Sequence, residues 1–148
     1  MLQWLCRDIP YRLHWLSRLI LAGVFLYSGY IKLQNPWQFA GVLTGYKLFP
    51  DVLIGPIADY FPWVEIALGL LFLIGLKIRY VAAVATALLL FFIVILTITN
   101  IRGLDANCGC FSFDDKISPM TIARDSLILI PALYLLIAEP LLKRRLKH

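Results

Sequence analysis

Two cysteines separated by a single glycine, Cys108 and Cys110, are the residues whose type and spacing most directly suggest chemistry. They lie in a short polar stretch between two long apolar segments. A pair of thiols can cycle between dithiol and disulfide, or its two sulfurs can bind a soft metal ion. The compartment that the pair faces decides between these uses, because disulfides persist in oxidising surroundings.

The composition indicates a membrane protein. The chain of 148 residues is 61% hydrophobic and only 16% charged, with a mean hydropathy of +0.81. A soluble domain of this length has too small an interior for so much apolar surface. The net charge of +5 comes from basic residues that flank the apolar segments, with no stripe of interleaved aromatics. We therefore expect the lipid bilayer as a partner and no nucleic acid.

Four apolar stretches approach the length of about 20 residues that a membrane-spanning helix needs. We expect an all-α membrane protein, a single domain over 1–148, built as a four-transmembrane-helix bundle. The predicted helices are 16–33, 61–76, 80–101 and 122–142, joined on one side by the connections 34–60 and 102–119.

The connections differ in character. A tight turn at 76–79 predicts that the second and third helices are antiparallel neighbours. The longer 34–60 segment is rich in aromatic residues, which are typical of the membrane interface. Within it we expect a short amphipathic helix near 37–46.

The distribution of Lys and Arg predicts the orientation. With four spans, both termini share a side with the 77–79 turn, and most basic residues fall on that side. They are Arg7, Arg12, Arg18, Lys77, Arg79, Lys143, Arg144, Arg145 and Lys147. The positive-inside rule then predicts cytoplasmic termini in a bacterial cytoplasmic (inner) membrane. Cys108 and Cys110 would face the periplasm.

The spacing of the cysteine pair favours redox exchange over a structural disulfide. A bridge across one residue closes a very small ring, which restrains little of the unfolded chain. Such a ring departs from relaxed disulfide geometry, and strain makes a disulfide easier to reduce. Gly109 relieves part of the backbone constraint. A structural pair stays open as an alternative.

Metal binding is the third interpretation, and no metal site is predicted. Structural zinc sites use four ligands, yet Cys6, His14 and His148 all fall on the predicted cytoplasmic side. The outer side offers two thiolates and some carboxylates, which make a poor tetrahedral site. Two thiolates would suit a soft ion such as Cu(I) or a site shared with a partner.

Charged residues near the outer ends of the predicted helices form a second group: Lys32, Glu65, Arg102, Arg124 and Asp125. Basic side chains at helix ends commonly extend to the interface, and an acidic residue is favourable at a helix start. Glu65 is harder to explain, because an intramembrane carboxylate usually faces the bundle interior and pairs with a cation. Lys32 and Arg124 are the candidate partners. The same cations would favour a thiolate at the cysteine pair.

Short motifs follow one another from about Arg18 to Leu136. They are Gly29-x-x-Lys32, Tyr46-Lys47-Leu48-Phe49-Pro50, Pro62-Trp63-Val64-Glu65, Arg102-Gly103, Cys108-Gly109-Cys110-Phe111 and Arg124-Asp125. In this order they resemble the MauE branch of the DoxX-like integral membrane protein family. The resemblance implies a four-helix membrane bundle and a link to maturation of methylamine dehydrogenase, a disulfide-rich periplasmic enzyme. Related DoxX-like proteins are linked to quinone-coupled sulfur oxidation. The family often has Gly where this chain has Ser112.

Three functional hypotheses stay open. The first is a membrane-embedded thiol–disulfide exchange or redox maturation protein that uses Cys108 and Cys110. Its partner would be a periplasmic thioredoxin-like protein or a maturing client, and a quinone in the bundle could carry the electrons further. As an enzyme it would be a thiol–disulfide oxidoreductase. The second is a non-catalytic accessory subunit that stabilises a larger membrane complex. The third is a binder of a soft metal or a small ligand.

Overall fold

The computed structural model describes the backbone of residues 2–146 and the side chains of residues 10–141, 143 and 144. Its elements are α1 (Leu2–Gln34), α2 (Pro36–Tyr46), α3 (Asp51–Ile74), α4 (Ile78–Ile101) and α5 (Pro119–Leu146). In the described part of the chain, β structure is limited to one isolated bridge between Asn107 and Lys116. The predicted all-α class is confirmed.

Four helices contain segments that are long and apolar enough to cross a membrane. These segments are Pro10–Gln34, Asp51–Ile74, Ile78–Ile101 and Pro119–Leu141. Large apolar side chains cover much of the outer surface, among them Leu19, Leu73, Phe91 and Leu127. Such exposure suits a surface in contact with lipid tails, which are as apolar as leucine. The chain is a multi-pass membrane protein with the predicted four spans.

The first helix begins earlier than predicted. α1 starts at Leu2 rather than near residue 16. Charged residues such as Arg7 and Arg12 interrupt the apolar pattern there. They are nevertheless good helix formers, so the helix continues through them.

The 34–60 connection is also more helical than predicted. α3 begins at Asp51 rather than near residue 61, and it contains Pro56 and Pro62. Each proline removes one helical N–H, and the helix continues through both of them. The short helix expected near 37–46 is confirmed as α2, which starts with Pro36 in its first turn, where a missing N–H is harmless.

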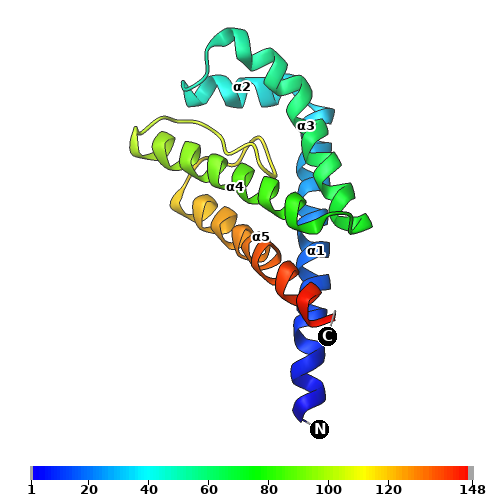
Figure 1. The fold of residues 1–148 in the computed structure, drawn as a ribbon. Coiled ribbons are helices and arrows are strands. Elements are labelled where there is room, and N and C mark those ends of the chain that lie inside the picture. The colour runs from blue at the N-terminus through cyan, green and yellow to red at the C-terminus, as the bar shows by residue number, and fades with distance from the viewer. Residues whose placement is uncertain (1, 147–148) are drawn as a thin grey trace.

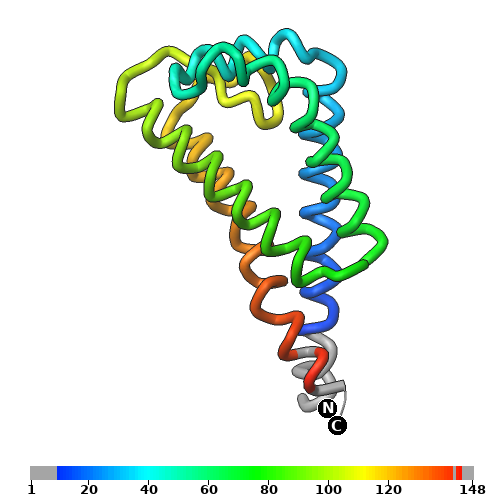
Figure 2. The backbone as a smooth tube through the Cα atoms, turned by 45° about the horizontal axis from the view of Figure 1, so that its top comes forward, coloured from blue at the N-terminus to red at the C-terminus, as the bar shows by residue number. Residues whose placement is uncertain are grey.

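The spans pack as two pairs, α1 along α3 and α4 along α5 (Figure 1). A short turn joins α3 to α4, as predicted, with Gly75 in the left-handed region at φ 82° and its N–H donated to the carbonyl of Leu71. Both termini lie at one end of the molecule, whereas α2 and the 102–118 loop lie at the other (Figures 1 and 2).

The buried core has two parts. One lies between the spans and includes Leu21, Phe25, Phe72, Ala82 and Leu135. The other lies beneath α2 and includes Phe39, Leu43, Tyr46, Leu96 and Cys108. Because Cys108 belongs to this second core, the loop that carries the cysteine pair is packed into the bundle.

Candidate functional site

The 102–118 loop folds back on itself and holds the cysteine pair at the end of the bundle. The backbone N–H of Cys108 donates to the carbonyl of Asp115 at 2.7 Å. The phenol of Tyr46, from α2, donates to the carbonyl of Cys108 at 2.6 Å. Burial raises the pKa of the Tyr46 phenol well above its ordinary value, so the hydroxyl stays protonated and remains a donor. The loop is therefore fixed to α2.

Gly109 is required for two reasons. Its φ of +67° lies in the left-handed region, where side chains with a Cβ are strained. A Cβ at this position would also lie 2.9 Å from Cγ1 of Val42 on α2. The glycine between the two cysteines therefore lets the loop approach α2 closely.

The two thiols are free, and both face the carboxylate of Asp125 near the start of α5. Oδ2 of Asp125 lies 3.8 Å from Sγ of Cys108 and 3.5 Å from Sγ of Cys110. Cys108 is fully buried, whereas Cys110 is partly exposed. The pair is therefore asymmetric, with Cys110 the more exposed residue of the two.

Arg124 adds a positive charge beside the buried sulfur. Its Nη2 lies 3.6 Å from Sγ of Cys108, and its Nε lies 3.3 Å from Oδ1 of Asp125. Nη1 lies 3.6 Å from the carboxylate of Asp115, and the guanidinium carbon lies 4.6 Å from the ring centroid of Phe111. These contacts from several sides direct the guanidinium toward the thiol of Cys108.

The surroundings separate the pKa values of the two thiols. Hydrogen bonding from the Cys110 thiol lowers the pKa of Cys108, and Arg124 acts in the same direction. The same hydrogen bond, together with burial, raises the pKa of Cys110 well above its ordinary value. The carboxylate of Asp125 opposes ionisation of both thiols. Cys108 is therefore the member of the pair that carries a thiolate first.

A second polar cluster joins α1 to α3 inside the bundle. Nζ of Lys32 lies 2.7 Å and 2.8 Å from the two carboxylate oxygens of Glu65, and 2.8 Å from Oγ of Ser28. Ser28 in turn donates to Oε1 of Glu65 at 3.1 Å. Lys32 is only 1% exposed and Glu65 only 5%. Of the two predicted cations for Glu65, the structure selects Lys32.

Three phenylalanine rings surround the ammonium group of Lys32. Its Nζ lies 5.1 Å from the ring centroid of Phe39 and 5.4 Å from those of Phe61 and Phe92. These distances are within the range of cation–π attraction. Since an ammonium group has three protons, the two carboxylate oxygens and Ser28 already use its hydrogen-bonding capacity.

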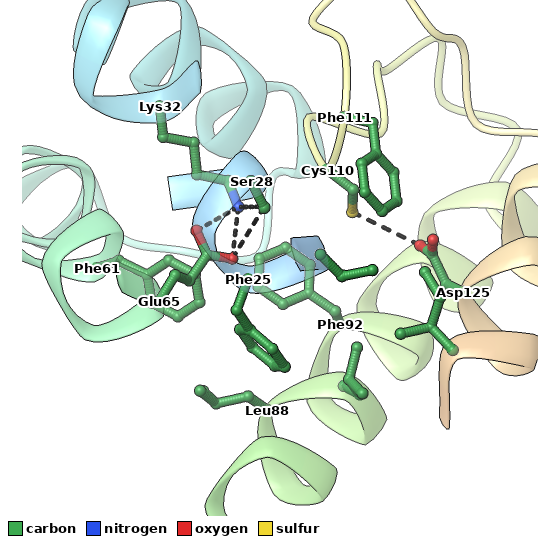
Figure 3. A pocket seen from close by; sticks show the side chains of 13 residues that line it. Phe25, Ser28, Lys32, Phe61, Glu65, Leu88, Phe92, Cys110, Phe111 and Asp125 are labelled. Carbon is green, nitrogen blue, oxygen red and sulfur yellow. Dashed lines mark hydrogen bonds and ion pairs between the residues drawn. The ribbon is translucent and has the colours of Figure 1, made fainter. Parts of the chain in front are cut away.

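A small cavity of about 40 Å³ separates the two clusters, between the helix pairs (Figure 3). Ser28, Lys32 and Glu65 line one part of it, and Cys110 and Asp125 line another. A cavity of this size has room for a few water molecules. It is far smaller than pockets that enclose a cofactor ring.

The structure brings together most of the predicted site residues and separates one from them. Asp125 contacts Cys108, Cys110 and Arg124, and Arg124 also contacts Cys108, with Lys32 and Glu65 across the cavity. Arg102 lies at the C-terminal end of α4 with an exposed side chain, outside the lining of the cavity.

Sequence reasoning missed Ser28, Tyr46 and the phenylalanine rings. Ser28 had a local signal, because it precedes Lys32 by four residues and so shares its helix face. Tyr46 and the rings had none. Their roles depend on contacts between helices that are distant in sequence.

Comparisons with known proteins agree with this architecture. Residues 11–138 match the family model described as methylamine utilisation protein MauE. The methylamine utilization protein MauE of Paracoccus denitrificans is 31% identical over 130 residues, covering 86% of this chain and 69% of that protein. That of Paracoccus versutus is 30% identical over 124 residues, covering 82% and 67%.

The MauE protein of Methylophilus methylotrophus is 32% identical over 95 residues, covering 64% of this chain. The chain spans about half the length of that relative, with 50% covered. No solved structure matches the chain. The family match covers most of the chain and is joined by relatives of about 30% identity, so this membrane protein belongs to the MauE family.

Proposed function

We propose that this chain is an accessory protein of methylamine utilisation that acts by thiol–disulfide exchange through Cys108 and Cys110. The name of its relatives, methylamine utilisation protein MauE, supports the first part. One observation carries the second: the partly exposed Cys110 lies beside a buried Cys108 whose sulfur touches Arg124 at 3.6 Å. This asymmetry suits a disulfide in which a partner attacks the sulfur of Cys110 and the sulfur of Cys108 is the leaving group.

In the first step, a partner thiolate attacks Sγ of Cys110 in the oxidised chain. A bond forms between the partner sulfur and Cys110, and the bond between Cys110 and Cys108 breaks. The electron pair leaves on Cys108, where the guanidinium of Arg124 stabilises the new thiolate. Exchange is faster when the leaving thiol has a low pKa, and the direction found for Cys108 agrees.

In the second step, the partner's other thiol resolves the mixed disulfide. It attacks the partner sulfur that is bonded to Cys110, and the partner leaves with a new disulfide. Cys110 departs as a thiolate and takes up the proton that the partner thiol loses. The carboxylate of Asp125, 3.5 Å from Sγ of Cys110, is placed to pass this proton. The chain ends as a dithiol, so the partner has been oxidised.

Returning the chain to its disulfide form requires an acceptor of two electrons. A membrane quinone or the disulfide of a second protein would serve. The cavity of about 40 Å³ is too small for a quinone ring. A quinone would therefore bind elsewhere on the bundle, within reach of the partly exposed Cys110.

The orientation belongs to the same proposal. Both termini lie at the end opposite the cysteine loop (Figure 2), and basic residues are concentrated toward the termini. Cytoplasmic termini and a periplasmic loop in the inner membrane follow from the positive-inside rule. In intact cells, a membrane-impermeant maleimide should label a Cys110-only variant and leave a Cys6-only variant unlabelled. The opposite pattern would reverse the orientation.

Trapping with single serine variants tests the exchange. Cys108→Ser leaves Cys110 without its resolving neighbour, so it should accumulate a mixed disulfide with its partner. Cys110→Ser leaves only the buried Cys108 and should trap much less. The double variant is the matched control. If neither single variant forms a mixed disulfide, the exchange hypothesis is rejected and the accessory-subunit hypothesis is retained. In that case the double serine variant should still support assembly of the membrane complex.

A further inference from the structure

The two sulfurs and the Asp125 carboxylate also make up a set of possible metal ligands. One ligand atom from each of Cys108, Cys110 and Asp125 lies within 4.8 Å of the other two. We propose that the reduced chain binds one thiophilic divalent cation of the zinc type at these three residues. This inference does not rest on the exchange function, since it concerns the dithiol in the absence of any partner.

The spacing of the donors fits tetrahedral coordination. Zinc bonds of about 2.3 Å to sulfur and about 2.0 Å to oxygen place a sulfur and an oxygen about 3.5 Å apart in a tetrahedron. The observed distances from Oδ2 of Asp125 are 3.5 Å to Cys110 and 3.8 Å to Cys108. The donors are therefore close to a metal geometry before any ion is added.

The charges also fit. Two thiolates and one carboxylate carry three negative charges, and a divalent cation with the guanidinium of Arg124 carries three positive ones. A neutral cluster avoids most of the free-energy penalty that a net charge pays at a buried site. Without the ion, three negative groups would face a single guanidinium, which disfavours full ionisation.

Arg124 also acts as an outer partner of the ligands. Its Nε lies 3.3 Å from Oδ1 of Asp125, which leaves Oδ2 directed at the two sulfurs. Its Nη2 lies 3.6 Å from Sγ of Cys108. Contacts of this kind orient metal ligands and strengthen binding.

The fourth position of the tetrahedron has a place for water. The cavity of about 40 Å³ is lined by Cys110 and Asp125 and is large enough for water. Three protein ligands and one water form an open site, which differs from the closed four-ligand sites of structural zinc. Carboxylates were expected on this side of the bundle, but the sequence did not show that Asp125 reaches both sulfurs.

The full-length chain, reduced and purified in detergent on a Cys6→Ser background, can be titrated with Co²⁺ as a spectroscopic probe. We expect one Co²⁺ per chain, with a sulfur-to-cobalt charge-transfer band that Zn²⁺ abolishes by displacement. The band should be lost in Cys108→Ser and in Cys110→Ser. Co²⁺ that binds without the band, or no binding at all, would overturn the site.

Asp125→Asn decides whether the site has three donors. We expect the affinity for Co²⁺ to fall by more than the roughly 10- to 100-fold that loss of an outer partner of a ligand costs, because Asp125 binds the ion directly. Asp114→Asn removes the same charge from an exposed position in the loop and should leave the affinity unchanged. Equal affinities for Asp125→Asn and the parent chain would reduce the site to a two-sulfur chelate and overturn the proposal.

A second variant guards against misfolding at position 125. Asp125→Cys replaces the oxygen donor with a sulfur and should restore Co²⁺ binding with a more intense charge-transfer band. If Asp125→Cys shows a normal thermal unfolding transition but binds Co²⁺ no better than Asp125→Asn, position 125 does not supply a ligand and the proposal is overturned. Partner trapping on metal-free protein reports on exchange separately, so the two proposals can fail independently.

Discussion

Two polar clusters face the same small cavity, and they are built differently. In the Lys32–Glu65 cluster, every proton of the ammonium group has an oxygen acceptor, and aromatic rings enclose it. In the cysteine cluster, two thiols share one carboxylate oxygen, and Cys110 is partly exposed. A fully paired, enclosed cluster stabilises a fold, whereas a cluster with polarizable, incompletely paired groups near solvent is suited to react or bind.

The largest expected effect tests the stabilising role of the first cluster. Lys32→Met leaves the carboxylate of Glu65 buried without a counter-charge, and loss of one partner of such a pair typically costs about 3–5 kcal/mol. We expect the free energy of unfolding in detergent to fall by this amount. Lys116→Met, at an exposed loop position, is the matched control and should change little.

A double variant distinguishes pairing from simple packing. Lys32→Met with Glu65→Leu removes both charges and should recover much of the lost stability, because apolar replacements of buried ion pairs are often tolerated. If the double variant is as unstable as Lys32→Met, the loss of stability does not come from an unpaired charge on Glu65, and the explanation by charge pairing is wrong.

The next effect concerns the backbone of the cysteine cluster. Gly109→Ala forces a side chain into the left-handed region and places its Cβ 2.9 Å from Val42. We expect a loss of about 2–4 kcal/mol, from the backbone strain and the overpacking together. Gly103→Ala has a similar φ of +65° but open space around the Cβ, so it should lose only about 1–2 kcal/mol. Equal losses of unfolding free energy in the two variants would mean that the close contact with Val42 does not contribute to the cost of Gly109→Ala.

A smaller effect tests whether Arg124 sets the redox behaviour of the pair. Arg124→Gln removes the charge 3.6 Å from Sγ of Cys108, so the thiolate of the reduced form becomes less stable. We expect the reduction potential to become more negative by about 30 mV, which is tenfold in the equilibrium constant. Equilibration with glutathione buffers measures it. Arg102→Gln, at an exposed position outside the cavity, should leave the potential unchanged.

The sequence predicts the two clusters unequally. Hydropathy identifies the four spans, and the rule that an intramembrane carboxylate pairs with a cation leads from Glu65 to Lys32 and Arg124, of which Lys32 is the partner in the structure. The start of α3 was predicted wrongly because the aromatic-rich 34–60 segment was interpreted as a connection at the membrane interface, whereas packing against α1 and α2 supports a helix that includes Pro56.

The cysteine cluster depends more on long-range contacts. Tyr46 reaches the carbonyl of Cys108 across 62 residues, and no local pattern announces such a bond. Asp125 was recognised as a helix-start residue, but its equal reach to both sulfurs depends on how the loop closes over α5. The sequence therefore identified the cysteines and Asp125 as candidate site residues, but it could not show that these three side chains meet.

The smallest expected effect compares an exposed charge of the cysteine cluster, Asp115, with the charge of Arg124 beside the buried Cys108. Asp115 also pairs with Arg124, at 3.6 Å, but its side chain is 47% exposed. Solvent screens such a pair, and exposed pairs contribute about 0.2–1 kcal/mol. Asp115→Asn should therefore raise the reduction potential by no more than about 20 mV, since the backbone carbonyl that accepts from Cys108 is retained. A shift as large as that of Arg124→Gln would show that Asp115 controls the guanidinium, and that the exposed rim belongs to the reactive cluster.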